Sequence, residues 1–280
     1  MKTYKEISAD KKGTLELKGL IEIYEEIAAA KMQQIRSAIL DSREYFDGLA
    51  KMSDEVGSDL DVGPDHKKRH AVVFLSADAG LFGDIIDKIL VDFLSFVEKN
   101  KADVFIAGKL GVELMHSYAP RIKYQYFELS DDKINMEEFG EVVKKLLEYQ
   151  KISVFYGKFV SIVIQNSSVS TMSGKSLEEF EKSEDEKEKE IKQRHYIYEP
   201  SLEAISEKFG NEILTSVFEQ TVRESQLAKY ASRLMHLDFA LENVDERLKT
   251  IHSDRRRIKK RINGKKQTER VARLISVGKF

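Results

Sequence analysis

The sequence contains no cysteine and no tryptophan, and only three of its 280 residues are proline. Without cysteine the chain can form no disulfide framework, thiolate nucleophile or thiol-ligated zinc or iron–sulfur site. No apolar stretch approaches the ~18 residues that a membrane-spanning helix needs. The N-terminal segment MKTYKEISADKKG lacks the apolar core of a signal peptide, and its acidic residues argue against a transit peptide. We therefore expect a soluble protein that reaches a membrane only through partners.

Charged residues are abundant and their signs are nearly balanced, with 46 Lys and Arg residues and 48 Asp and Glu residues. No overall field therefore steers the protein towards nucleic acid or acidic membranes. The charges are segregated along the chain: residues 255–273 hold ten Lys or Arg and one Glu, while residues 178–192 hold eight acids and four lysines. The basic tract fits a solvated helix end or a surface that docks on an acidic protein. Nucleic acid is a third option, although no aromatic residue or recognition module accompanies the tract.

Apolar residues near both ends of the chain repeat with helical spacing. From about residue 15 to residue 52, one stripe comprises Ala28, Met32, Ile35, Ile39, Ser42, Phe46 and Leu49, and a second stripe of Leu17, Leu20, Tyr24 and Ile27 adjoins it. The C-terminal stripe alternates steps of three and four at Leu227, Tyr230, Leu234, Leu237, Leu241, Val244, Leu248 and Ile251. A helix of ~60 residues there would span roughly 90 Å, more than a domain of this size can bury. Pairing within one chain and self-dimerisation both explain the stripes, and the second stripe in the same chain favours intrachain pairing.

The middle of the chain alternates between predicted strands and helices. Segments 71–76, 102–108, 122–129 and 159–165 are rich in β-branched and aromatic residues and predict strands, with helices predicted over 85–100, 112–118 and 136–149. The expected fold is therefore α/β: a long antiparallel coiled coil of N- and C-terminal helices with an inserted Rossmann-like sheet domain. The expected divisions are a coiled-coil helix over 1–58, an α/β foot domain over 70–198 and a second coiled-coil helix over 199–280.

Two glycine-bearing segments invite a phosphate-binding interpretation, which neither supports. SADAGLFGD (76–84) lacks the Gly-x-Gly-x-x-Gly spacing; its glycines suit a tight turn, and Asp78 could cap the helix that follows. VSTMSGKS (169–176) ends like a Walker A loop, but Val169 replaces the leading glycine and an acidic run follows, so we interpret it as a surface loop. His66 and His70 fall in a predicted loop, and no histidine has metal-ligand spacing. With no defensible triad or carboxylate pair, we expect a non-enzyme without catalytic, cofactor or metal sites.

Six stretches resemble, in order, the γ subunit of F-type ATP synthases. SADAGLFGD resembles the family's D-x-G-L-x-G turn through Asp78, Gly80, Leu81 and Gly83, and IYEEIAAAKMQQIRSAI resembles its N-terminal helix. FIAGKLGVELM, VFYGKFVSIVIQ and YIYEPSLEAI are similar to its G-x-K-G, Y-N-K-F-V-S and Y-x-x-E-P-S segments. RESQLAKYASRLMHLDFALENVDERL resembles a C-terminal segment of the family through Glu224, Ser225, Arg233, Asp238, Ala240 and Asn243, although the family's S-E-H is absent.

The resemblance implies a non-catalytic rotor, the central stalk of an ATP synthase. Its coiled coil stands inside a ring of three alpha and three beta subunits, and its α/β domain lies against the epsilon subunit and the membrane c-ring. Such a subunit binds no nucleic acid, does not insert into the membrane and, in bacteria, works at the cytoplasmic face of the cell membrane. A rotor of a divergent ATP-hydrolysing rotary ATPase, a self-dimerising coiled-coil scaffold and an enzyme built on the α/β domain are the alternatives.

The sequence departs furthest from the family at the C-terminal end. The usual Y-N-x-x-R-Q appears as His252, Ser253, Arg256 and Arg257, and the basic tract stretches the turn that follows. The residues that we expect to contact the catalytic ring are Arg233, Arg255, Arg256, Arg257, Thr268 and Glu269. The tract is expected to meet acidic groups of the ring, while Asp78, Gly80, Leu81 and Gly83 form a structural turn of the foot domain.

Overall fold

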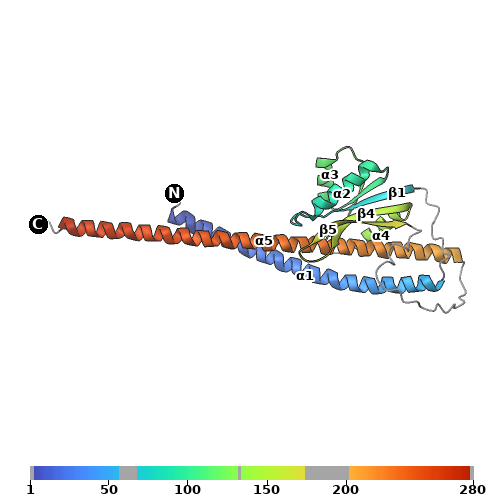
Figure 1. Ribbon diagram of the computed structural model, residues 1–280, viewed down its shortest axis with the longest axis horizontal. Coiled ribbons are helices and arrows are strands. Elements are labelled where there is room, and N and C mark those ends of the chain that lie inside the picture. The colour runs from blue at the N-terminus through green and yellow to red at the C-terminus, as the bar shows by residue number, and fades with distance from the viewer. Residues whose placement is uncertain (1–2, 57–67, 132–133, 174–201, 278–280) are drawn as a thin grey trace. The chain divides into compact units, whose positions relative to one another are not determined.

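The structure, a computed structural model, describes residues 3–56, 68–131, 134–173 and 202–277. The chain divides into two compact units, one of Met1–Ile27 with Leu234–Phe280 and the other of Ala28–Arg233. Two long helices, α1 (Tyr4–Val56) and α5 (Leu202–Val277), contribute to both units. All the strands that the structure describes lie in the second unit, together with three shorter helices (Figure 1).

A five-stranded sheet forms the centre of the second unit, with the strand order β3-β2-β1-β4-β5. The strands are β1 (Lys68–Leu75), β2 (Asp103–Ala107), β3 (Tyr124–Phe127), β4 (Tyr149–Phe159) and β5 (Gln165–Ser173). The first four strands run parallel, and β5 pairs with β4 in antiparallel register from Gln165 opposite Phe159 to Ser173 opposite Lys151. The result is a mixed α/β fold in which only β5 reverses direction.

Both faces of the sheet are covered, so the central strands are buried and mostly apolar over residues 71–75, 104–107 and 152–157. Helix α2 (Ile85–Lys99) packs on one face, where the ring of Phe93 lies 5.1 Å from that of Phe74 and 5.7 Å from that of Phe155. The other face packs against α4 (Met136–Leu146) and against Phe218 and neighbouring apolar residues of α5. Helix α3 (Lys109–Tyr118) follows β2.

The predicted strand over 159–165 is wrong, because residues 160–164 form the turn of a hairpin between β4 and β5. The helix predicted over 136–149 ends at Leu146, and Tyr149 begins β4. Val169 to Ser173, interpreted as part of a surface loop, belong to β5, and the rest of the Walker-like segment lies outside the described residues. His70 lies in β1 rather than in a loop, and His66 is not among the described residues.

In the first unit, α1 and α5 run side by side in opposite directions. Ile21 of α1 clusters with Leu237 and Val244 of α5, and Lys18 Nζ donates to Asp245 Oδ1 at 2.7 Å. Helix α1 begins well before its apolar stripe because Thr3 and Glu6 form a capping box, in which Glu6 Oε2 accepts from Thr3 N at 2.7 Å and Thr3 Oγ1 accepts from Glu6 N at 3.3 Å.

Helix α5 is longer than the ~60 residues expected, at 76 residues. The predicted stripe lies on its packed side, since Leu227, Tyr230, Leu237, Val244 and Ile251 are buried. Beyond Ile258 the helix continues past the start of α1, and residues 259–273 are exposed on every side (Figure 1).

Candidate functional site

The glycine-bearing turn after β1 is a tight connection between β1 and α2. Leu81 and Gly83 have φ values of 68° and 63°, in the left-handed region that favours glycine. The side chain of Phe82, which lies between them, is buried. Gly80 is not among the described residues with positive φ, so the conformation of this turn does not require a glycine at position 80. The turn therefore depends on Gly83 and on a strained Leu81.

Asp78 caps a different helix from the one predicted. Its Oδ1 accepts from the backbone N–H of Lys109 at 3.2 Å, at the start of α3, while α2 begins after Asp84, which makes no side-chain cap. The carbonyl of Ala77 accepts from Leu110 N at 2.8 Å. A helix N-terminus that follows a parallel strand is where a phosphate would bind. Here two of its N–H groups already donate to the protein itself.

The β1 turn and the start of α3 lie too close for any side chain at Gly108. This glycine has a φ of 95°, and a Cβ atom placed on it would lie 2.7 Å from the backbone nitrogen and oxygen of Ala77. Gly111, in the first turn of α3, is similarly close to the side chains of Ser76 and Ile106. The segment after β1 and the start of α3 are thus in direct backbone contact, with no space for a side chain or a ligand between them.

A buried ion pair connects α5 to the carboxyl ends of the strands. Lys229 of α5 pairs with Asp131, which follows β3, and its Nζ also donates to the carbonyl oxygen of Ser76 at 2.7 Å. The other carboxylate oxygen of Asp131 accepts from Asp78 N at 2.5 Å. Both charged side chains are at least nine-tenths buried, so each depends on the other for compensation. We call this network the Lys229 clamp.

Arg233, one turn further along α5, extends the clamp to the glycine-bearing turn. Its guanidinium donates to the carbonyl oxygen of Gly80 at 2.9 Å and lies 3.9 Å from the centre of the Phe82 ring. The Tyr230 ring packs edge-on against Phe82. The structure therefore places Arg233 beside the predicted turn residues, and its contact with a catalytic ring stays a prediction.

Lys229 and Asp131 were not among the residues that the sequence singled out. The one signal that could have pointed to Lys229 was its position between Leu227 and Tyr230 of the apolar stripe, and this did not indicate a partner. In the structure, Gln226 of the same helix also contacts this region, because its amide donates to the carbonyl oxygen of Ser130 at 3.1 Å. The carboxyl edge of a parallel sheet is where doubly wound proteins bind ligands. In this chain, side chains of α5 occupy that edge.

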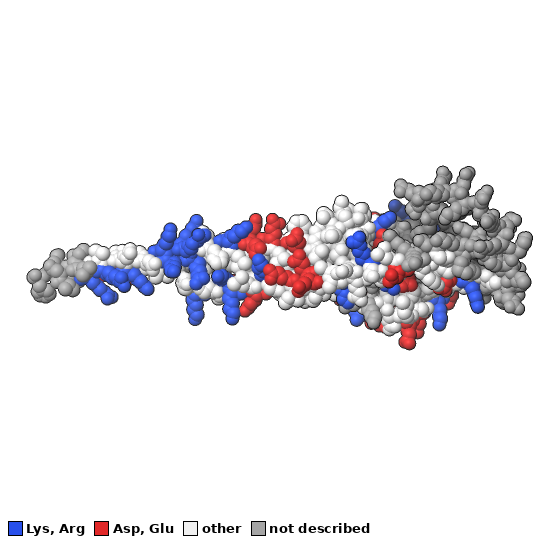
Figure 2. Space-filling view, turned by 90° about the horizontal axis from the view of Figure 1, so that it is seen from below, with Lys and Arg blue, Asp and Glu red and all other residues white. Residues whose placement is uncertain are grey.

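The basic residues of α5 form a separate group in the first unit. Arg255 is half-buried, donates to Tyr4 Oη at 2.9 Å and lowers the pKa of that phenol through the hydrogen bond and its charge. Arg256 and Arg257 are exposed. Figure 2 shows Lys and Arg side chains along this part of the helix.

Thr268 and Glu269 lie further along the same helix and form no common cluster with Arg255, Arg256 and Arg257. Both are exposed, and the Thr268 hydroxyl donates to the carbonyl of Gly264 in its own helix at 3.0 Å. Thr268 lies eleven positions beyond Arg257 along the helix, or roughly 17 Å. The C-terminal residues predicted to contact a partner thus form an extended surface and not a compact site.

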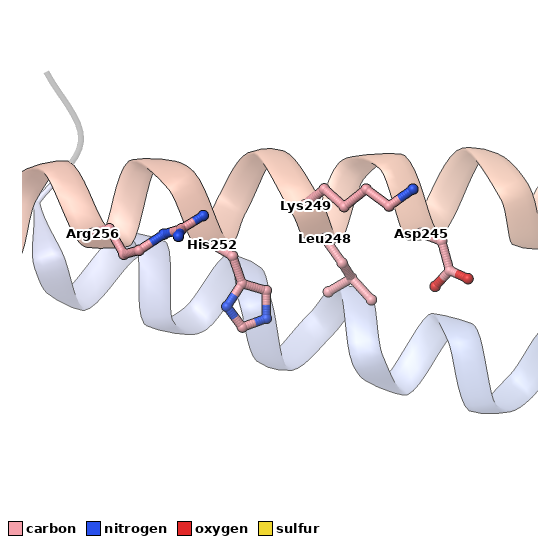
Figure 3. Close-up of a pocket in the computed structure, with 5 residues that line it drawn as sticks. All are labelled: Asp245, Leu248, Lys249, His252 and Arg256. Carbon is pink, nitrogen blue, oxygen red and sulfur yellow. The ribbon is translucent and has the colours of Figure 1, made fainter.

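An open groove of about 620 Å³ lies along α5 where it passes α1. Its lining residues are Asp245, Leu248, Lys249, His252 and Arg256 (Figure 3). Lys249, His252 and Arg256 follow each other at helical spacing, so this side of α5 is basic, while Asp245 is held by Lys18. The groove belongs to the basic surface of α5 and adds no group suited to catalysis.

No cluster of metal-ligating side chains occurs in the part of the chain that the structure describes. His70 is half-buried in β1 and hydrogen-bonds Ser153 Oγ at 3.0 Å; burial, followed by the charge of Lys151, lowers the pKa of its ring. Among the described helices, none has an apolar stretch long enough to cross a membrane.

The sequence model of the ATP synthase family matches residues 3–272. An ATP synthase gamma chain of Chloroherpeton thalassium is 24% identical over 275 residues, and one of Prosthecochloris aestuarii is 26% identical over 275 residues; both alignments cover 90% of each chain. Among solved structures, a chain from the central stalk and c-ring of the Tetrahymena thermophila mitochondrial ATP synthase aligns with a TM-score of 0.58 at 16% identity, covering 79% of this chain and 99% of that one. Because the family model spans nearly the whole chain, and the relatives that match it are ATP synthase gamma chains, this chain belongs to the ATP synthase gamma family.

Proposed function

We propose that this chain is the central-stalk rotor of an F-type ATP synthase. It would couple ion translocation through a membrane sector to ATP synthesis or hydrolysis in a catalytic ring. The family match over residues 3–272 carries the proposal. Its partners are three alpha and three beta subunits, the epsilon subunit and the membrane c-ring, and it works peripherally at the cytoplasmic face of a bacterial cell membrane.

The rotor consists of an antiparallel coiled coil, formed by residues 1–58 and 199–280, with a Rossmann-like foot domain over residues 70–198. The cluster of Ile21, Leu237 and Val244 and the Lys18–Asp245 ion pair support the coiled coil. The order of the four parallel strands, β3-β2-β1-β4, is that of doubly wound sheets and supports the foot domain.

The chain acts without catalytic residues of its own. In doubly wound enzymes the carboxyl edge of the sheet holds substrate or cofactor, and in this chain Lys229 and Arg233 contact the loops at that edge. The same contacts suit a rotor, because the sheet must turn with α5 when the helix turns. Rotation of an asymmetric helix surface within a ring then gives each catalytic site different contacts and shifts its conformational population.

The arginines at the start of the basic tract are expected to bind acidic groups of the ring. Replacing Arg255, Arg256 and Arg257 together by glutamine should weaken binding to a ring of alpha and beta subunits by about tenfold at low salt, since exposed charge pairs contribute a few tenths to one kcal/mol each. ATP-driven ion pumping by the reconstituted complex should fall as well. Binding is measured by titrating the ring with labelled chain at several salt concentrations.

The control for this triple variant removes three exposed cations from the sheet-bearing unit, as Lys99→Gln, Lys101→Gln and Arg121→Gln. It changes the net charge equally and should leave both readouts close to the wild-type values. Equal affinity of the arginine variant and the wild type across all salt concentrations would reject the role of the arginines in ring binding.

Intrachain pairing of α1 and α5 is tested by disulfide crosslinking, with no background because the chain has no cysteine. We expect Ile21→Cys to crosslink on oxidation with Leu237→Cys or Val244→Cys, the residues that it packs against, at the mass of one chain. Phe239→Cys, which is 54% exposed, serves as the control and should not crosslink. Crosslinks found only at twice the chain mass would favour a self-dimerising scaffold instead.

A further inference from the structure

The turn between β4 and β5 exposes an apolar surface that the fold does not use. Of its five residues, Val160, Ile162, Val163 and Ile164 are apolar, and each is between 51% and 69% exposed. The turn is nonetheless well fixed: Ile164 O accepts from Ser161 N at 3.0 Å, and the Gln165 amide donates to two carbonyls of the turn. A preorganised turn with four exposed branched side chains is typical of an interaction site.

Strand β5, which follows this turn, is an edge strand of the described sheet and carries none of the usual sequence features that protect an edge. It is nine residues long and pairs only with β4 among the described strands. Its sequence, QNSSVSTMS, contains no charged residue and no proline, and its register with β4 continues from end to end without a bulge. Edge strands that avoid pairing are usually short, charged, bulged or interrupted by proline. Within the part of the chain that the structure describes, this edge is therefore open to the addition of a further strand.

An acidic groove of about 480 Å³ lies between the start of β5 and α2. Its lining residues are Asp84, Asp87, Lys88, Val91, Asp92, Asn166 and Ser167. Lys88 pairs with Asp84 at 2.9 Å, so the groove keeps an excess of negative charge at Asp87 and Asp92. The Ser167 hydroxyl is enclosed without a hydrogen-bond partner among the described residues. The groove thus offers polar groups suited to a cationic side chain beside an uncharged edge.

We propose that β5, the apolar turn and the acidic groove together form a strand-addition surface for a partner protein. The partner supplies an extended segment that pairs with the free edge of β5. Its apolar side chains cover Val163 and its neighbours, and a lysine or arginine reaches Asp87 or Asp92. Backbone pairing gives affinity, while the turn and the groove fix the register of the added strand.

The unpaired backbone and the acidic charge favour an extended protein segment over a lipid surface. A bilayer leaves a sheet edge unsatisfied, and anionic headgroups repel the aspartates. The proposal rests on the proposed function only in expecting the partner among the subunits of the same complex. Its test must therefore separate the failure of the surface from the failure of the complex.

The test compares hydrogen exchange of β5 amides in the full chain alone and in the complex purified from host membranes. We expect the edge-facing amides of residues 166–172 to exchange about tenfold or more slowly in the complex, because a new ladder protects them. Val163→Asp should abolish most of this protection. Tyr118→Asp is the matched control, because Tyr118 lies at the end of α3 and is also 69% exposed.

The outcomes are distinguishable. A chain that fails to co-purify with alpha and beta subunits contradicts the proposed function. A chain that co-purifies while its β5 amides exchange at the free rate overturns the strand-addition surface and leaves the rotor intact. Protection of β5 in the chain alone at twice the chain mass would identify a second copy as the occupant. Protection by vesicles of mixed zwitterionic and anionic phospholipid would identify a membrane, and either result overturns the proposal.

Discussion

Replacing Lys229 by methionine is expected to lower the free energy of unfolding by about 3 to 5 kcal/mol. The substitution leaves the carboxylate of Asp131 buried without its cation and removes the hydrogen bond to the carbonyl of Ser76. An uncompensated buried charge costs far more than the loss of a surface ion pair. The change is measured as a shift of the urea midpoint at pH 7, followed by far-ultraviolet circular dichroism.

The companion variant adds Asp131→Asn to Lys229→Met and should recover most of the lost stability. The amide is neutral and still offers an oxygen to Asp78 N, so the remaining network stays satisfied. Lys208→Met, on an exposed part of the same helix, controls for the loss of a lysine and should change stability by less than about 0.5 kcal/mol. If the single and double variants are equally unstable, the loss of stability comes from the changed packing of the residue 229 side chain and not from the uncompensated charge of Asp131.

Replacing Gly108 by alanine should destabilise the sheet-bearing unit by about 3 kcal/mol or more. Two costs add: a non-glycine residue at a φ of 95° is strained by roughly 1 to 3 kcal/mol, and the new methyl group meets the backbone of Ala77 at 2.7 Å. The neighbour is main chain, which cannot rotate away as a side chain would. Thermal unfolding of the variant should show a clearly lower transition temperature.

Gly140→Ala is the matched control for this prediction. Gly140 lies within α4 with no atom near its absent Cβ, so alanine should stabilise the helix by roughly 0.5 to 1 kcal/mol. The same chemical change is thus expected to act in opposite directions at two positions. A Gly108→Ala variant as stable as the wild type would mean that the β1 turn and the start of α3 are further apart than the structure shows.

Much of the architecture could be predicted from the sequence, because its longest elements are periodic. The stripe from Leu227 to Ile251 was assigned to the packed side of a helix, and most of its residues are buried. The middle of β1 and most of β2 are buried, so these two strands appear in the sequence as short apolar runs, whereas β3 at the sheet edge is partly exposed. In these segments, local preference and tertiary burial agree.

The hairpin between β4 and β5 was mispredicted because local preference and burial disagree there. Val160 to Ile164 is the most β-branched run in its neighbourhood, yet it forms the exposed turn. Residues 165–173 are mostly polar and small, and they form a strand through pairing with β4. Strand preference measures fit to a packed surface, so it predicts a strand wrongly where β-branched residues lie in an exposed turn.

The site was harder to predict than the fold, because its contacts join distant parts of the chain. Asp78 was expected to cap the helix that follows it and instead caps α3, 31 residues away. Lys229 meets Asp131 across 98 residues, and nothing local distinguishes it from other helical lysines. Helical spacing gives a residue's side of a helix but not its partner across the fold.

The pairing of α1 with α5 has a consequence for synthesis on the ribosome. Lys18 and its partner Asp245 are separated by 227 residues, so at 5 to 20 residues per second about 10 to 45 s pass between their translation. During this interval Ile21 and the other apolar residues on the packed side of α1 have no partner from α5. The nascent chain therefore presents an amphipathic helix for much of its translation, and we expect it to depend on a holding chaperone more than a protein with local contacts would.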